Sequence, residues 1–124
     1  MSEKRLYALR GAVQCLNEAE DIRKQVVLLY DALCTQNNLE EADIVSLVFS
    51  VTADLTALNP ATALRQSGRA ADLALFAVRE AETQGCLERT VRALIHCYLP
   101  QGFIPRRVYR NGTEGLRPGG RAVE

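Results

Sequence analysis

Apolar residues follow two different periods along the chain, one typical of strands and one typical of helices. The run over residues 6–13 is short, mostly apolar and contains strand-forming residues, so it predicts a strand interrupted at Arg10-Gly11. Beyond it, apolar residues recur every three or four positions, which predicts an amphipathic helix over about 18–35. The positions that carry this helical spacing are Ile22, Val26, Leu29 and Leu33.

Polar residues mark where two helices are expected to begin. Asn17, followed three positions later by Glu20, is typical of a helix N-cap with its capping-box partner. Asn59-Pro60 predicts a second, shorter helix, with Asn59 as the N-cap and Pro60 in the first helical position. We expect this second helix to stop at Gly68.

Three further apolar runs predict strands. Residues 43–52 and 71–79 are rich in Val, Ile, Leu and Phe, which favour buried strands. In residues 88–99, apolar side chains alternate with others that include Arg92 and His96. This alternation predicts a strand, although periodicity alone leaves a helix open.

The end of the chain departs from regular structure. Gly102 and Pro105 limit the segment that contains them to a short helix or turn, and we expect a flexible tail from about residue 111. The predicted elements follow the order β-α-β-α-β-β-α. This order predicts a single small α/β domain over residues 1–124, with a mixed sheet packed by helices.

Composition narrows the range of partners. The 15 basic side chains balance the 15 acidic ones, which argues against general binding to nucleic acid or to a membrane surface. Only Lys4 and Lys24 are lysines, so the other basic residues are arginines. This bias either follows from genome composition or serves the recognition of planar carboxylates, which the guanidinium group matches in pairs of hydrogen bonds.

The cysteines favour a reduced compartment. Four cysteines and one histidine show no metal-ligand spacing, so we expect no metal site. The first residues are charged and their apolar run is short, so no signal peptide or membrane span is expected. Four thiols without a secretory signal indicate a cytoplasmic protein with mostly buried, reduced cysteines.

Arginines inside apolar strands are the main candidates for a site. Arg10 and Arg92 each lie within an apolar run, where a guanidinium group needs a partner. Glu80 closes a predicted strand and Tyr109 lies near the tail. His96 is interpreted as structural, since the sequence indicates no serine or cysteine paired with it. Such a set suits anion binding and electrostatic stabilisation better than proton transfer or covalent chemistry.

Several short motifs together resemble the small α/β chorismate mutases, a family unrelated to the all-helical class of this enzyme. The matching pieces are Leu9-Arg10-Gly11-Ala12, Asp54-Leu55, Pro60-Ala61 followed by Arg65, then Glu80, Gly85, Leu87 and Arg92, then Val108-Tyr109 and Leu116-Arg117-Pro118. Each piece is weak by itself, but their order and gaps agree nearly end to end. The resemblance implies an isomerase of aromatic amino acid biosynthesis that rearranges chorismate to prephenate by a pericyclic shift, without cofactor, acid, base or covalent intermediate.

The resemblance also implies roles for the two central residues. Arg92 would be the cation beside the ether oxygen, where negative charge builds in the transition state. Glu80 would accept a hydrogen bond from the ring hydroxyl of the substrate. It further implies a pseudo-barrel homotrimer with its sites between subunits.

The remaining site residues would bind the dianionic substrate. Arg10 and Tyr109 would contact its carboxylate and side-chain oxygens. Arg65 and Arg117 would add positive potential, with Arg117 acting from a tail that orders over the ligand.

Three substrate-side positions depart from the pattern of the family. Asn59 stands where an aromatic residue is usual, Thr62 where a lysine lies near a substrate carboxylate, and Ala77 where a cysteine contacts the ring hydroxyl. These departures keep two alternatives open beside chorismate mutase. One is a family member that acts on a different anionic substrate, and the other is a non-catalytic module that binds anions.

Overall fold

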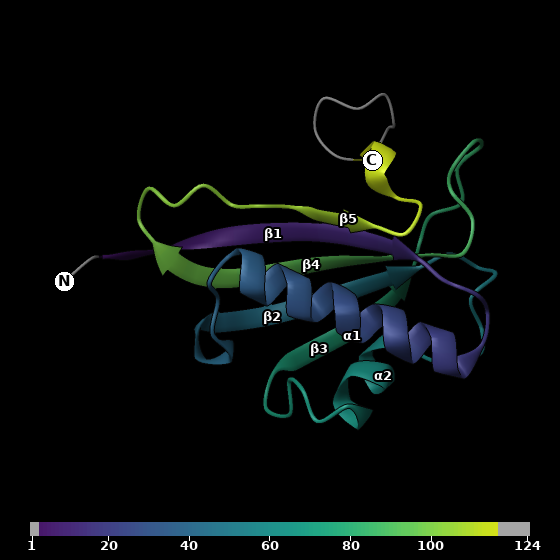
Figure 1. Ribbon diagram of the computed structural model, residues 1–124, viewed down its shortest axis with the longest axis horizontal. Helices are drawn as coiled ribbons and strands as arrows, with labels where there is room; N and C mark the ends of the chain where they lie inside the picture. Colours follow the sequence, from purple (N-terminus) through teal and green to yellow (C-terminus); the bar gives the residue numbers. More distant parts are fainter. Residues whose placement is uncertain (1–2, 117–124) are drawn as a thin grey trace.

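The computed structural model describes residues 3–116, which form a five-stranded mixed sheet packed by two helices (Figure 1). The strands are β1 (Lys4–Gln14), β2 (Ile44–Val51), β3 (Ala74–Arg79), β4 (Thr90–Pro100) and β5 (Val108–Arg110). The helices are α1 (Ala19–Gln36) and α2 (Pro60–Gln66), with short 3-10 turns η1 (Glu41–Asp43) and η2 (Glu114–Leu116). The α/β class and the mixed sheet predicted from the sequence are confirmed.

The strands follow the order β3-β2-β4-β1-β5 across the sheet. The central strand β4 pairs antiparallel with β1 on one side and β2 on the other. The outer strands β3 and β5 pair parallel with β2 and β1, respectively. Helices α1 and α2 lie on the same side of the sheet (Figure 1). One face of the sheet is therefore covered by helices, and the other face, called the open face below, is not.

Side chains along β4 point alternately to the helix-covered face and to the open face of the sheet. The residues that pack towards the helices are buried, and these are Val91, Ala93, Ile95, Cys97 and Leu99. Their neighbours, including Arg92 and His96, are only partly buried and lie on the open face. Because side chains alternate with a period of two in a strand, this pattern confirms the strand, rather than a helix, for residues 88–99.

The start of α1 differs from the prediction. The N-cap is Glu18, without a side-chain capping bond, so the capping box of Asn17 and Glu20 was wrong. The side chain of Asn17 instead accepts hydrogen bonds from the backbone N–H groups of Thr56 and Ala57, both at 2.9 Å. A tertiary contact to the segment before α2 has therefore replaced the local cap.

The short helix or turn predicted around Gly102 and Pro105 is a turn at residues 101–102, and the strand β5 follows it; β1 runs unbroken through Arg10-Gly11. Gly11 permits both. A Cβ atom at Gly11 would lie 2.7 Å from the carbonyl oxygen of Val108 and 3.0 Å from Cδ1 of Leu29. Without that atom, β5 can approach β1 closely and bring Tyr109 with it.

The described part of the predicted flexible tail packs against β1. Thr113 is fully buried, and its hydroxyl lies 2.9 Å from the carbonyl oxygens of Ala12 and Arg110, to which it donates. Leu116 is also buried. The rest of that tail, with Arg117, lies outside the described residues.

All four cysteines are free thiols. Burial raises the pKa of Cys15 and Cys97 to about 11, so both are protonated at neutral pH. Cys86 is exposed. Within residues 3–116, no helix has the length and apolar character needed to cross a membrane.

The close approach at Gly11 gives a test of the fold. Gly11→Ala should lower Tm by about 4 °C or more, because crowding a packed interior costs roughly 1–3 kcal/mol. Thermal unfolding followed by circular dichroism measures this. Gly115→Ala is the matched control, since a Cβ atom at Gly115 has no neighbour within 4 Å. Equal Tm values for the two variants would contradict the packing role of Gly11.

Candidate active site

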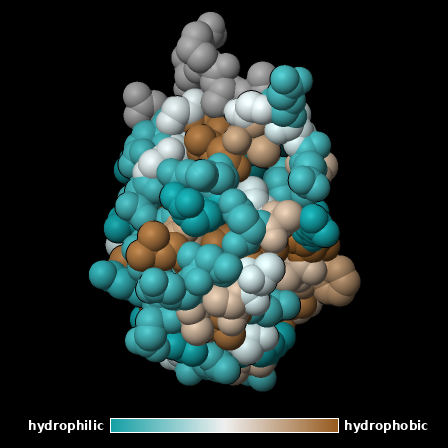
Figure 2. Space-filling view, turned by 90° about the vertical axis from the view of Figure 1, so that its right-hand side faces the viewer, coloured by the Kyte–Doolittle hydropathy of each residue, from teal (hydrophilic) through white to brown (hydrophobic). Residues whose placement is uncertain are grey.

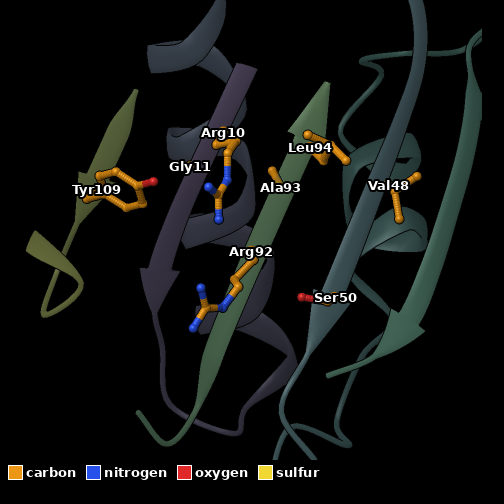
Figure 3. Close-up of a pocket in the computed structure, with 8 residues that line it drawn as sticks. All are labelled: Arg10, Gly11, Val48, Ser50, Arg92, Ala93, Leu94 and Tyr109. Atoms are coloured by element: carbon orange, nitrogen blue, oxygen red, sulfur yellow. The ribbon is translucent and has the colours of Figure 1, made fainter. Parts of the chain in front are cut away.

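A cleft of about 220 Å³ lies on the open face, over the middle of the sheet (Figure 3). Four strands supply its walls, and the lining residues are Arg10, Gly11, Val48, Ser50, Arg92, Ala93, Leu94 and Tyr109. Three of the residues predicted to form the site, two arginines and the tyrosine, are thus brought together. The cleft is otherwise mostly apolar, so these charged and polar groups dominate its chemistry.

Strand register explains why these side chains meet. Arg92 pairs with Ser50 of β2 on one side and with Ala12 of β1 on the other. Ala12 pairs in turn with Tyr109 of β5. Arg10 lies two residues from Ala12 on β1 and therefore on the same face. In Figure 3 the hydroxyl of Tyr109 points towards β1 and Arg10.

Glu80 supplies the carboxylate of the site. It follows β3 directly, and its backbone N–H donates to the carbonyl oxygen of Val51 at 2.7 Å, which continues the strand pairing by one residue. Its Oε1 then lies 3.4 Å from Nε of Arg92. The two side chains are 27% and 20% exposed, so this ion pair is largely withdrawn from water yet open to a ligand. Figure 3 shows the terminal nitrogens of Arg92 turned towards β1, away from Ser50.

Ser50 is a site residue that the sequence did not single out. Its hydroxyl donates to Oε1 of Glu80 at 2.5 Å, the same oxygen that faces Arg92. A serine within a run of apolar strand residues was the available signal. Ser46, on the same face of β2, gives the same signal but lies 3.3 Å from Nδ1 of His96, outside the cleft. Only the pairing across strands distinguishes the two serines.

Arg65 and Thr62 do not line this cleft. Thr62 is exposed on α2. The guanidinium group of Arg65 donates to three backbone carbonyls in the loop between α2 and β3, those of Ala70, Ala71 and Leu73. Within the chain, Arg65 therefore holds this loop closed.

A second hollow, of about 320 Å³, lies where β3 ends beside the start of α2. Asn59 and Ala77 line it together with Arg79, whose Nη2 is 3.7 Å from Oε1 of Glu82. The side chain of Asn59 accepts a hydrogen bond from the backbone N–H of Ala61 at 2.8 Å, which confirms it as the N-cap of α2. Two of the three positions that depart from the resemblance thus share one hollow, separate from the cleft of Arg92.

Within residues 3–116, no group of three or more His, Cys, Asp or Glu side chains is arranged to hold a metal ion. What the cleft offers is the cation of Arg92, which is held by the carboxylate of Glu80, together with further donors on a mostly apolar floor. Such an arrangement can bind an anion and stabilise charge that develops within it.

Comparison with known proteins gives one consistent family. The model of the family "Chorismate mutase type I" matches residues 6–119. Chorismate mutase AroH of Bacillus subtilis (strain 168) is 27% identical over 116 residues, which cover 91% of each chain. Chorismate mutase AroH of Thermus thermophilus is 32% identical over 114 residues, which cover 89% of this chain and 92% of the relative. A solved chorismate mutase from Clostridium thermocellum has a TM-score of 0.81 and 34% identity, covering 87% of this chain and 97% of that one.

Proposed function

Since the chain belongs to the type I chorismate mutase family and is thus an isomerase that rearranges chorismate to prephenate, we propose that Arg92 and Glu80 carry this reaction in the cleft of the open face. The reaction is intramolecular: an ether C–O bond breaks while a C–C bond forms, and no atom is gained or lost. The observation that carries the proposal is the ion pair between Glu80 and Arg92, since Arg92 lines the cleft together with Arg10 and Tyr109.

Arg92 is proposed to stabilise the transition state. Bond breaking runs ahead of bond making, so negative charge grows on the ether oxygen as the barrier is approached. A cation fixed beside that oxygen binds the transition state more strongly than the substrate, and this difference lowers the barrier. Glu80 and Ser50 support this role, because they hold the guanidinium group and its carboxylate in place before the substrate arrives.

Arg10 and Tyr109 are proposed to bind the substrate in its reactive shape. The enolpyruvyl arm must fold over the ring before the new bond can form, and donors that grip its oxygens favour this conformer. The register of β1, β4 and β5 supports the proposal, since it puts both residues on the face of Arg92. Arg65 and Arg117 are proposed to add positive potential around the dianion. Arg65 would do so while its guanidinium group donates to the backbone carbonyls of Ala71 and Leu73.

We also propose that the protein is a homotrimer with its sites between subunits. Four large apolar side chains of the open face are 41–66% exposed, namely Leu6, Phe76, Val78 and Tyr98. In Figure 2, where the open face lies to the right, apolar colour gathers on that side. A second copy of the chain could bury this surface. The hollow with Asn59 and Ala77 would then complete the cleft of a neighbouring subunit and bring Thr62 towards its substrate.

A cytoplasmic location is part of the same proposal. It is supported by the free state of all four cysteines, since secreted proteins commonly pair theirs.

Turnover of chorismate by Arg92→Ala tests the proposed role. Loss of the cation should lower kcat about 10³-fold or more while the protein stays folded, as judged by circular dichroism. Loss of the diene absorbance of chorismate, with identification of prephenate, measures this. Arg5→Ala, an exposed arginine of the same sheet, is the control and should keep wild-type kcat. Wild-type turnover by Arg92→Ala would contradict the mechanism.

The family match and the named relatives favour chorismate mutase over the two alternatives, a different anionic substrate and a non-catalytic module.

The hydroxyl of Ser50 gives a second test. Ser50→Ala should lower kcat/KM about three- to tenfold, since Glu80 loses a charge-assisted hydrogen bond and is held less firmly. Ser46→Ala is the matched control, because that hydroxyl lies on the same face of β2 but outside the cleft. Equal kcat/KM values for the two variants would remove Ser50 from the proposed site.

The open face gives a test of assembly. Light scattering should report about three times the 13.7 kDa mass of one chain. Phe76→Glu puts a charge on the open face and should shift the protein towards monomer with loss of activity, because each site would lose its neighbouring wall. Leu28→Glu, at an exposed position of α1, should leave the mass unchanged. A monomeric wild-type protein would contradict the trimer.

A further inference from the structure

The carboxylate of Asp54 holds the start of the central strand. The backbone N–H of Arg89 donates to both of its oxygens, at 3.1 Å to Oδ1 and 3.0 Å to Oδ2. The hydroxyl of Thr52 donates to the same Oδ1 at 2.5 Å and accepts the backbone N–H of Thr90 at 2.9 Å. We call these four residues the Asp54 latch. It joins the segment after β2 to the first residue of β4.

Arg89 requires this support because its backbone is strained. Its φ is 45°, in the left-handed region that residues other than glycine seldom adopt. Its N–H is held by Asp54, and its carbonyl oxygen accepts the backbone N–H of Cys15 at 3.0 Å. With both polar groups fixed from opposite sides, Arg89 turns the chain into β4, three residues before Arg92.

The Asp54 latch and the ion pair of Glu80 and Arg92 are both anchored to the segment over residues 51–54. The loop between β3 and β4 begins at Glu80, which is bonded to the backbone of Val51, and ends at Arg89, which is bonded to Asp54. Both ends of the loop are thus fastened within residues 51–54. A hollow of about 210 Å³ lies under the loop and is lined by Asp54 and Glu80 among others.

We propose that Asp54 is a positioning residue, which fixes the distance between Glu80 and Arg92 by holding Arg89 in its strained conformation. The proposal rests on the role of Arg92 proposed above. Asp54 does not line the cleft, so it acts only through the backbone that leads into β4.

The charge state of Asp54 suits this role. Burial raises the pKa of its carboxyl group, but hydrogen bonds from Thr52 and from the N–H of Arg89 outweigh burial, and the net pKa lies below the ordinary value of 3.8. The group is therefore an ionised acceptor at neutral pH.

Loss of the latch should affect kcat more than KM. Arg92 acts mainly on charge that appears in the transition state, so its displacement removes an interaction that the bound substrate does not yet make. Arg10 and Tyr109, on β1 and β5, lie outside the displaced segment and should keep substrate binding near normal. A residue with only a structural role would lower Tm without this split.

Kinetics of Asp54→Ala, with rescue by glycine, test the proposal. Asp54→Ala should lower kcat about 10- to 100-fold and change KM less than about threefold. Arg89→Gly should restore most of the lost kcat in the double variant, because glycine adopts a φ of 45° without strain. Asp72→Ala, at an exposed carboxylate before β3, is the matched control and should keep wild-type kcat.

The NMR signal of the Arg92 Nε–H group reports the geometry independently of activity. It should shift in Asp54→Ala and return in the double variant. Each of three results would overturn the proposal. The first is wild-type kcat in folded Asp54→Ala, and the second is a loss of kcat that Arg89→Gly does not rescue. The third is an unchanged Nε–H signal of Arg92 in Asp54→Ala. Turnover by Arg92→Ala together with a shifted signal in Asp54→Ala would instead overturn the role of Arg92 and leave the latch geometry standing.

Discussion

A guanidinium group on the central strand of an apolar sheet needs a partner of opposite charge, yet it must remain accessible to a ligand. Much of this structure satisfies these two requirements together. Arg92 pairs by its Nε with Glu80, and its terminal nitrogens stay turned towards the cleft. β4 is bonded on both edges, so the backbone that carries Arg92 has little freedom. Helices on the opposite face supply the apolar burial that holds the sheet together.

Local patterns were sufficient for part of the fold and of the site. The helical spacing of α1 and the alternation of β4 act over a few residues, so both elements could be predicted. Arg10 and Arg92 were recognisable as arginines in apolar strands, and the family resemblance implied the roles that are proposed for them. The role of Ser50 could not be predicted, because it depends on register with Arg92 and contact with Glu80 across the sheet.

The wrong predictions have the same physical origin, which is competition from contacts distant in sequence. Asn17 has the chemistry of an N-cap, but it bonds the segment before α2 instead of its own helix. β5 is too short to show a period, and its pairing depends on the missing Cβ atom of Gly11. The departure at Asn59, in contrast, has a local reason, since its side chain caps α2.

The pairing of β1 with β4 also sets the order in which this protein can mature on the ribosome. Lys4 is opposite Pro100, and β5, the other neighbour of β1, begins only at Val108. While the chain is being synthesised, β1 therefore has neither partner until residues 90–110 have emerged. A truncated nascent chain holds α1 and the β2–β3 pair but no sheet centre. The cleft of Arg10, Arg92 and Tyr109 can therefore form only after β4 and β5 have both joined β1.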